Sequence, residues 1–347
     1  MPGQGAPAPE AVLRGQSALA RFALSGADFS LIRHNENAVY DVRADGKRYV
    51  LRIHAPAPGF EPLPLCFVDS LRQRKAEMEL LRFLKEGGLR AQTPVPGLDG
   101  DAVQRLDDGT PATLLEWAAG DSYDALWGDA NLPESAAYAA GFAAGRLNAL
   151  ARGTTQNFAR FRPRYGKGVL PIVDERLRAA HDAEVVNREQ LAVMRAALGR
   201  MGPLMRGTEA ETGLSLCHAD ISAGNLVWDG DAATLIDFSL AGIASPYLDL
   251  ASLLTNFTRG RVRDGLCAGW EDGYGKRALL RLAEPYCALV IMLFLSQRYP
   301  AAKEWDWFPD ALDGWTRDVF LPLARGETFI EGFVPKRAPF TPALKIP

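Results

Sequence analysis

The hydrophobic and polar positions along the chain divide it into a strand-rich first third and a helical remainder. From about residue 29 the pattern alternates with period two, which is typical of half-buried strands. The expected strands are 38–43, 48–54, 101–106 and 110–117. Between the second and third of these, apolar residues at helical spacing predict a helix over 69–86 that ends at a pair of glycines.

Beyond residue 120 the pattern becomes helical, with one short hairpin in its middle. The hairpin is expected at 225–228 and 233–238, around an Asp-Gly-Asp turn. The expected helices are 135–151, 171–198 (as one or two helices), 248–256, 270–282 and 285–298. We therefore predict an α+β fold with a loose tail at 1–10, a small β-rich N-lobe at 11–115 and a larger helical C-lobe at 116–347.

Length and composition limit the class of protein. The 347 residues are 48% hydrophobic and 23% charged, as in soluble globular proteins, which excludes wholesale disorder and a membrane bundle. A net charge of −3 argues against a general nucleic-acid or anionic-membrane binder, because such proteins need a cationic surface. The scattered cysteines, Cys66, Cys217, Cys267 and Cys287, favour reduced thiols over a disulfide pair, and no secretory signal is recognisable. We expect a cytoplasmic protein that binds neither nucleic acid nor membrane.

The segment 216–238 carries the clearest chemistry. It reads LCHADISAGNLVWDGDAATLIDF, and it places His218, Asp220 and Asn225 in one loop and Asp237 after a hairpin. Phosphoryl transfer from ATP needs a carboxylate beside the attacking hydroxyl and oxygen ligands that hold Mg²⁺ against the phosphates. Each residue alone is also explained by a turn or a cap, but their order and spacing together predict a kinase site. We expect Asp220 to orient and deprotonate the hydroxyl, and Asn225 and Asp237 to bind the metal.

These motifs resemble the aminoglycoside phosphotransferase and choline kinase-like superfamily. CHADISAGNLVWD resembles its catalytic loop, LIDFSLAGIASPYLDLASLL resembles its metal-binding segment, and the likeness covers about residues 30–260. The resemblance implies a bilobal protein-kinase-like fold, with ATP and Mg²⁺ as cofactors and a small-molecule hydroxyl as acceptor. It also implies that Asp249 and His218 support the catalytic loop rather than react.

The resemblance extends to the nucleotide site. The segment YVLRIH matches the strand on which Val50 would cover adenine and Arg52 would reach the phosphates, and Glu77 matches the acid that pairs with this cation. The backbone of the connection between the lobes, at Glu116 and Ala118, would hydrogen-bond adenine. Protein kinases carry Lys at the place of Arg52, and the loop at 35–38 contains no glycine. The alternative for Arg52 is an ordinary surface charge.

The segment 303–318 holds several acidic and aromatic residues, among them Glu304, Asp306 and Trp307. Acids with aromatic faces suit a cationic ligand, but they also suit an ordinary amphipathic helix with its acids in water. The leading hypothesis is a small-molecule kinase acting on an aminoglycoside-like, amino-alcohol or homoserine-like compound. The alternatives are a Ser/Thr protein kinase of the same superfamily and a nucleotide-binding scaffold without activity. The sequence leaves the oligomeric state open.

Overall fold

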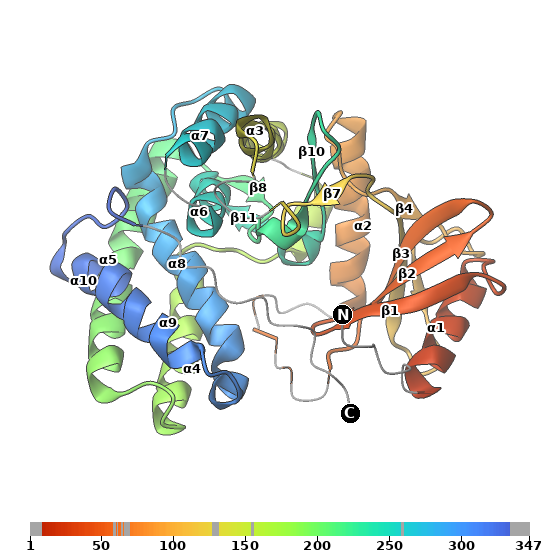
Figure 1. Ribbon diagram of the computed structural model, residues 1–347, viewed down its shortest axis with the longest axis horizontal. Coiled ribbons are helices and arrows are strands. Elements are labelled where there is room, and N and C mark those ends of the chain that lie inside the picture. Colours follow the sequence, from red (N-terminus) through yellow and green to blue (C-terminus); the bar gives the residue numbers. More distant parts are fainter. Residues whose placement is uncertain are drawn as a thin grey trace.

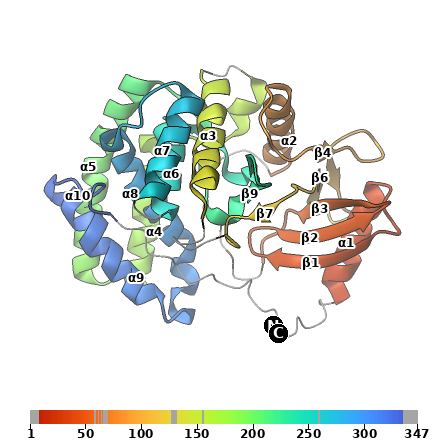
Figure 2. The ribbon, with the colours of Figure 1, turned by 45° about the horizontal axis from the view of Figure 1, so that its top comes forward.

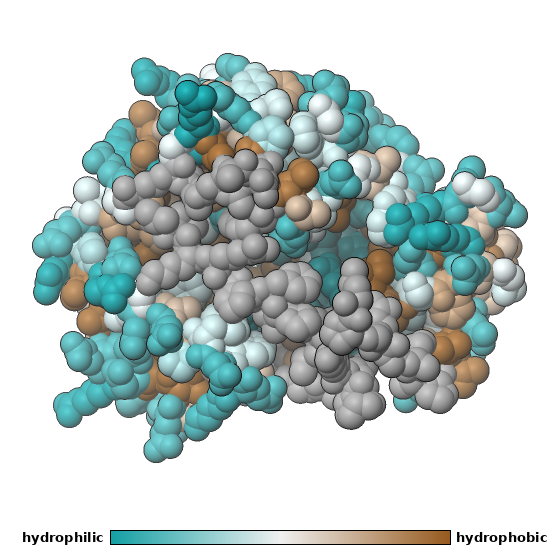
Figure 3. Space-filling view, in the orientation of Figure 1, coloured by the Kyte–Doolittle hydropathy of each residue, from teal (hydrophilic) through white to brown (hydrophobic). Residues whose placement is uncertain are grey.

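A computed structural model describes residues 9–333 apart from 58–59, 61, 64, 66–69, 127–131, 154–155 and 258–259. Its strand-rich part and its helical part lie side by side, with helix α2 (Ser70–Glu86) between them (Figure 1, Figure 2). This arrangement confirms the α+β fold class expected from the sequence. The face seen in Figure 3 is mainly hydrophilic, with hydrophobic residues in small separate groups outside its grey part.

The N-terminal part is a six-stranded antiparallel sheet in the order β1-β2-β3-β6-β4, with β5 paired to β6. Its strands are β1 (Asp28–His34), β2 (Ala38–Ala44), β3 (Lys47–Ile53), β4 (Pro94–Val95), β5 (Val103–Arg105) and β6 (Pro111–Glu116). The turn between β2 and β3 has positive φ at Asp45 and Gly46, the geometry that a two-residue hairpin requires. Helix α1 (Pro9–Arg21) covers one face of the sheet through Ala18 and Leu19, and Phe22 directly after it packs into the same core.

The rest of the chain is mainly helical. Its α-helices are α3 (Glu134–Leu150), α4 (Leu170–Asp182), α5 (Arg188–Thr212), α6 (Tyr247–Asn256), α7 (Arg261–Tyr274), α8 (Leu280–Arg298), α9 (Phe308–Trp315) and α10 (Leu321–Arg325). Two small sheets join them: β7 (Asp121–Ser122), β9 (Leu226–Trp228) and β10 (Ala233–Leu235) form one, and β8 (Ser215–Cys217) and β11 (Gly242–Ala244) form the other. The short helical turns are η1 (Asn157–Phe161), η2 (Lys167–Val169), η3 (Ala223–Asn225), η4 (Phe238–Leu240), η5 (Tyr299–Glu304) and η6 (Thr316–Phe320).

Several expectations from the sequence need correction. Pro9 and Glu10, expected in the tail, begin helix α1, while residues 1–8 lie outside the described part. The helix expected at 270–282 is instead the end of α7 and the start of α8, because Gly275 adopts a left-handed conformation and ends α7. The segment 171–198 forms two helices, as one of the two options had it. Cys217, Cys267 and Cys287 are free thiols, and Cys66 lies outside the described residues.

One helical stretch, Leu280–Glu304, is long and apolar enough to cross a membrane. Most of it is buried inside the fold, where α8 packs against α6, α5 and α4. A helix that is apolar on all sides and enclosed by other helices is a core helix. Its burial therefore accounts for its composition without a bilayer.

Helices α3 and α7 approach closely because glycines line their contact. A Cβ atom on Gly269 would overlap the carbonyl oxygen of Tyr138, and one on Gly141 would overlap the carbonyl oxygen of Leu266. Backbone atoms cannot move aside as a flexible side chain can, so these positions exclude even alanine unless the helices separate.

Replacing Gly269 by alanine is therefore expected to destabilise the protein by roughly 1–3 kcal/mol, since overpacking forces the two helices apart. Urea unfolding followed by circular dichroism measures the change. Gly199 on α5 provides the control, because no atom lies within 4 Å of its Cβ position. Gly199→Ala is expected to stabilise the protein by up to about 1 kcal/mol through helix propensity alone. Equal effects of the two substitutions would contradict this account of the α3–α7 contact.

Candidate active site

The loop that carries His218 and Asp220 is held by the carboxylate of Asp249, in the first turn of α6. Asp249 accepts hydrogen bonds from the backbone N–H groups of His218 at 3.0 Å and Ala219 at 2.9 Å, and from the Asn148 side chain at 2.8 Å. Ala219 has φ 68°, a left-handed conformation that a non-glycine residue adopts only where its surroundings impose it. Burial raises the pKa of Asp249 to about 6 although these donors oppose it. Asp249 thus fixes the backbone on which Asp220 is presented.

His218 is buried and connects this loop to the strand before Asp237. Its Nε2 lies 2.9 Å from the carbonyl oxygen of Ile236, and its ring packs 4.5 Å from that of Phe238. A carbonyl only accepts hydrogen bonds, so the proton is on Nε2. Within the described part of the chain, Nδ1 has no partner. Burial lowers the pKa of His218 to about 4 and keeps the ring neutral. His218 thus joins the loop that carries Asp220 to the residue directly before Asp237.

Asp220 and Asn225 lie together at the end of this loop. The Asn225 amide nitrogen donates to the backbone oxygen and to Oδ2 of Asp220, both at 2.9 Å. These contacts leave Asn225 Oδ1 without a donor in the described part of the chain. Burial, and then the negative charge of Asp237, raise the pKa of Asp220 to about 7. A carboxylate with this pKa is suited to accept a proton near neutral pH.

Asp237 lies directly after Ile236 and has left-handed backbone angles, φ 61° and ψ 71°. Arg52 donates to its Oδ1 at 3.0 Å, and Arg33 donates to its Oδ2 at 2.9 Å. Burial alone would raise the pKa of Asp237, but the two guanidinium groups outweigh it and hold this pKa well below the ordinary value. Asp237 is therefore a carboxylate at neutral pH, available as an anionic ligand.

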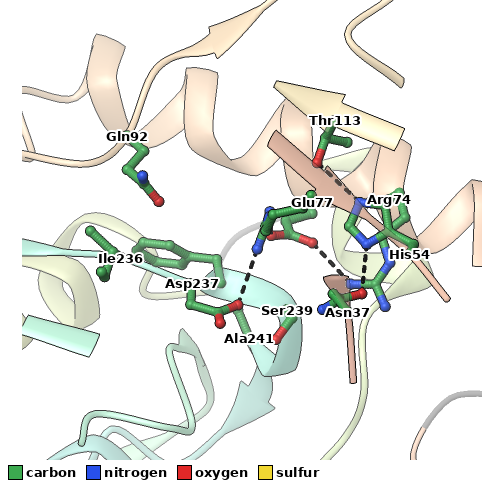
Figure 4. Close-up of polar contacts among 12 residues, drawn as sticks. Asn37, His54, Arg74, Glu77, Gln92, Thr113, Ile236, Asp237, Ser239 and Ala241 are labelled. Atoms are coloured by element: carbon green, nitrogen blue, oxygen red, sulfur yellow. Dashed lines mark hydrogen bonds and ion pairs between the residues drawn. The ribbon is translucent and has the colours of Figure 1, made fainter. Parts of the chain in front are cut away.

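A buried ion cluster connects Asp237 to helix α2. Glu77 has no exposed surface; it accepts a hydrogen bond from Arg52 and a second, at 3.2 Å, from Arg74. Figure 4 shows Glu77 between Asp237 on one side and Arg74 on the other. Glu79, two residues later on the same helix, is exposed. The structure thus brings Arg52 to Glu77, as the sequence resemblance implies, and the alternative of Arg52 as a surface charge is wrong.

Arg162, which the sequence analysis missed, anchors the segment after Asp237. Its guanidinium donates to the backbone oxygens of Phe238 at 2.6 Å, Ser239 at 2.7 Å and Ala241 at 2.7 Å, and to that of Gln73 on α2 at 3.1 Å. The residue comes from the irregular stretch before α4, where no local pattern marks it. It fixes the segment after Asp237 to the helix that carries Glu77.

The connection between the two parts of the chain lines a pocket with Glu116, Trp117 and Ala118. Val50 on β3 is half-buried and opposes Leu115 on β6, just before Glu116. The N–H of Trp117 donates to the Arg48 carbonyl at 3.1 Å, and the Arg48 guanidinium lies over the Trp117 ring. Among the described residues, nothing accepts a hydrogen bond from the N–H of Ala118. That donor is free for a ligand.

Side-chain oxygen atoms of Asn225 and Asp237 are of the kind that holds a divalent metal together with phosphates. Asn225 Oδ1 and the Asp237 carboxylate are oxygen donors, the kind that Mg²⁺ prefers. Within the described residues no group of three or more His, Cys, Asp or Glu side chains could hold a metal by itself. Mg²⁺ commonly takes one or two protein oxygens and completes its shell with phosphate oxygens and water. The residues present therefore fit a metal that binds with a nucleotide.

The structure places the acidic and aromatic segment near the C-terminus as an amphipathic one. Glu304 and Asp306 are exposed, while Trp305 and Trp307 are half-buried with their rings stacked at 5.7 Å. Trp307 also packs against Phe294 of α8. The aromatic rings thus face the core and the acids face water, so nothing in this packing requires a ligand.

Arg298, at the end of α8, is a second residue that the sequence analysis missed. Its guanidinium lies over the Phe294 ring at 3.5 Å and donates to the Phe294 carbonyl at 3.1 Å. Burial lowers the pKa of Arg298 to about 10, and the nearby Asp220 carboxylate acts in the opposite direction. Arg298 thus brings a positive charge from the C-terminal helices to the neighbourhood of Asp220.

Comparisons with known proteins agree with this arrangement. A family model described as the phosphotransferase enzyme family matches residues 28–280. The amicoumacin kinase of Bacillus subtilis (strain 168) is 26% identical over 247 residues, which cover 69% of this chain and 66% of that protein, just under two thirds of its length. A solved amicoumacin kinase in complex with AMP-PNP, Ca²⁺ and Ami superimposes with a TM-score of 0.66 at 17% identity, covering 94% of this chain and 97% of that one. A microcompartment-associated aminopropanol kinase gives 0.64 at 18% identity, covering 90% and 99%. These likenesses confirm the kinase-like fold.

Proposed function

Since the chain belongs to the phosphotransferase enzyme family, we propose that it transfers the γ-phosphate of ATP to a hydroxyl group of a small molecule, with Mg²⁺ as its metal. One observation carries the proposal: Asn225 binds Asp220, the charge of Asp237 acts on Asp220, and Asp237 binds Arg52 of the Arg52–Glu77 ion pair. Phosphoryl transfer depends on positioning and charge stabilisation more than on covalent chemistry, and these groups supply both.

Asp220 orients the acceptor hydroxyl and takes its proton. The acceptor oxygen forms a bond to the γ-phosphorus while the bond from that phosphorus to the bridging oxygen breaks and releases ADP. The pKa of about 7 lets Asp220 hold the proton after transfer and return it to water.

Arg52 binds the nucleotide phosphates, and Glu77 keeps its guanidinium in place. Val50 covers adenine, and the Ala118 N–H and the Glu116 carbonyl hydrogen-bond its edge. In these assignments the N-lobe at 11–115 supplies Val50, Arg52 and Glu77 to the nucleotide, and the C-lobe at 116–347 begins with the backbone that binds adenine and holds the metal and acceptor sites.

Asn225 Oδ1 and the Asp237 carboxylate are the groups that would hold Mg²⁺. The bound metal neutralises charge that develops on the phosphate oxygens during transfer. His218 and Asp249 keep the loop and the strand in register, so they act on the reaction only through position.

The segment after the metal ligand favours a small acceptor over a protein. Between Asp237 and α6 the chain forms only the turn η4 and the strand β11, so no long activation segment stands there to be phosphorylated. The relatives named above are kinases of amicoumacin and of aminopropanol. We infer a cytoplasmic enzyme whose acceptor is an aminoglycoside-like, amino-alcohol or homoserine-like compound.

An acceptor panel tests the proposal. Purified protein is incubated with ATP and Mg²⁺ and with amino alcohols, hydroxy amino acids, aminoglycosides and protein substrates, and ADP release is scored. Each amino alcohol is paired with a hydroxy amino acid of equal length, so that the panel measures whether the positive charge of Arg298 near Asp220 selects an acceptor with a carboxylate. Turnover of any small molecule supports the proposal. Phosphate on proteins alone favours the protein-kinase alternative, and a protein that binds no nucleotide favours neither.

The pH dependence of the rate gives a separate prediction. The reaction needs deprotonated Asp220, so kcat/KM is expected to rise through an apparent pKa of about 7. Arg298→Gln removes a charge that lowers this pKa. The acidic limb of the pH profile of kcat/KM is therefore expected to move to higher pH by roughly half to one unit. Arg298→Lys retains the charge and is expected to keep the limb near its wild-type position. An unchanged limb in Arg298→Gln would contradict the electrostatic link.

A further inference from the structure

A β-bulge near the end of β1 determines where Arg33 points. Leu31 opposes Tyr40 on β2 and Arg33 opposes Val39, so Ile32 has no partner on that strand. Side chains alternate between the two faces of a sheet, so without this extra residue Arg33 would share the face of Leu31, which packs toward α1. The bulge moves Arg33 to the opposite face of the sheet, toward Asp237.

That placement puts Arg33 in one row with Arg52. Val39 opposes Arg33 on one side and Arg52 on the other, so the three residues lie directly across from one another on neighbouring strands. Residues opposite one another in a sheet share a face. The two guanidinium groups therefore reach Asp237 from the same face and bind one carboxylate oxygen each.

The two arginines differ in how firmly they are held. The side chain of Arg52 is 4% exposed and is also bound by Glu77, whereas that of Arg33 is 44% exposed. Asp237 is the sole acceptor that Arg33 has among the described residues. An exposed guanidinium with one partner can leave at little cost, because water replaces the lost contact. Arg33 is thus the exchangeable cation of the pair.

Arg33 occupies the oxygen that a metal needs. Its Nη2 lies 2.9 Å from Oδ2 of Asp237, and a divalent cation at that oxygen would meet a positive charge at contact distance. A nucleotide brings new oxygens to which a guanidinium binds in a fork. The connection between β1 and β2, Asn35 to Asn37, has no glycine with which to bring backbone N–H groups close to phosphates. Binding of the phosphates near this connection is therefore left to a side chain, and Arg33 is close enough to supply it.

We propose that Arg33 exchanges its partner in each catalytic cycle: it binds Asp237 in the nucleotide-free enzyme and the nucleotide phosphates when the metal–nucleotide complex enters. In the first position it competes with free metal for Asp237, and in the second it strengthens nucleotide binding. The metal consequently binds more tightly when the nucleotide is bound, and the nucleotide binds more tightly with the metal. This inference rests on the proposed function, because it takes Asp237 as a metal ligand.

Two binding measurements on the full-length protein test the exchange. Electron paramagnetic resonance gives the affinity for Mn²⁺ alone, and calorimetry gives the affinity for AMP-PNP with Mg²⁺. For Arg33→Ala we expect Mn²⁺ alone to bind roughly three- to tenfold more tightly and Mg–AMP-PNP to bind about tenfold more weakly. Arg33→Lys keeps the charge without the fork, so intermediate values are expected in both measurements.

The control is Arg195→Ala. Arg195 binds Asp174 at 2.9 Å with side chains 50% and 23% exposed, close to the 44% and 19% of the Arg33–Asp237 pair. It lies on α5, away from the cleft residues, and both affinities are expected to stay at wild-type values. Unchanged Mn²⁺ affinity in Arg33→Ala would overturn the proposed competition between Arg33 and metal for Asp237. Unchanged or tighter binding of Mg–AMP-PNP would overturn the proposed contact between Arg33 and the nucleotide phosphates. Wild-type protein that binds no Mg–AMP-PNP overturns the proposed function itself, and that result needs no variant.

Discussion

Asp220→Asn is expected to lower kcat by about 10³-fold while leaving nucleotide affinity near its wild-type value. General base catalysis contributes about 10²–10⁴-fold, and the amide of asparagine cannot accept the hydroxyl proton. The substitution keeps the shape of the side chain, and an amide oxygen can still accept the hydrogen bond from Asn225. Initial rates with an acceptor from the panel, together with calorimetry with Mg–AMP-PNP, separate the two quantities. Wild-type turnover in this variant would exclude Asp220 as the base.

Asp220→Asn lowers the rate, but it is expected to stabilise the folded protein, and the gain in stability increases with pH. The pKa of Asp220 is raised from 3.8 to about 7 in the folded protein, so folding is penalised once the unfolded chain has lost this proton. The penalty is absent below about pH 4 and complete above about pH 7. Asp220→Asn removes it, so its melting temperature should exceed that of the wild type at pH 8 and match it at pH 4. A difference independent of pH would show that burial of the carboxylate is not the cause.

The sequence allowed us to propose Asp220, Asn225 and Asp237 as site residues because they are close together along the chain. Asp220, Asn225 and Asp237 fall within 18 residues, on a loop and a hairpin whose turn is visible in the sequence. Glu77 required more: a helical register that separates it from Glu79, and a resemblance that supplies its partner. The structure adds the contact with Arg52 itself.

Residues that tertiary structure brings next to the candidate site from distant segments could not be predicted. Arg33 points there only because Ile32 is an extra residue in β1, and a bulge has no clear mark in a single sequence. Arg162 comes from an irregular stretch and Arg298 from the end of a core helix. In each case the side chain acts on a segment far away in the sequence, so no local pattern contains the information.

The predicted start of one helix was wrong for a related reason. The glycines of α7 disfavour a helix by propensity, yet Gly269 lies inside it because only glycine lets α7 approach α3 closely. Packing therefore outweighs propensity at this position, and the sequence pattern placed the helix too late.

Glu77→Ala is expected to destabilise the protein by about 3–5 kcal/mol, because it leaves the Arg52 and Arg74 guanidinium groups buried without their shared carboxylate. Arg52 keeps Asp237 and Arg74 keeps Glu36 as acceptors, but among the described residues the Nε atoms of both arginines have no partner, so losing Glu77 adds to donors that are already unpaired. Burial would raise the pKa of Glu77, but the arginines hold it below its ordinary 4.5. The stabilisation is therefore complete above about pH 4.5 and is lost as the pH falls through this lowered pKa. Urea unfolding at pH 7 and at acidic pH measures both effects.

Glu79→Ala is the matched control, since Glu79 lies two residues along the same helix and is exposed. Its expected change is within about 0.5 kcal/mol, as for surface substitutions in general. Glu77→Gln keeps an acceptor for one guanidinium but no charge, so its stability should fall between those of wild type and Glu77→Ala. Nucleotide affinity should fall along the same series, because Arg52 loses the group that orients it toward the phosphates. Equal stability of Glu77→Ala and Glu79→Ala would mean that the buried pair is replaced by water at no cost, and that Glu77 does not hold Arg52 in place.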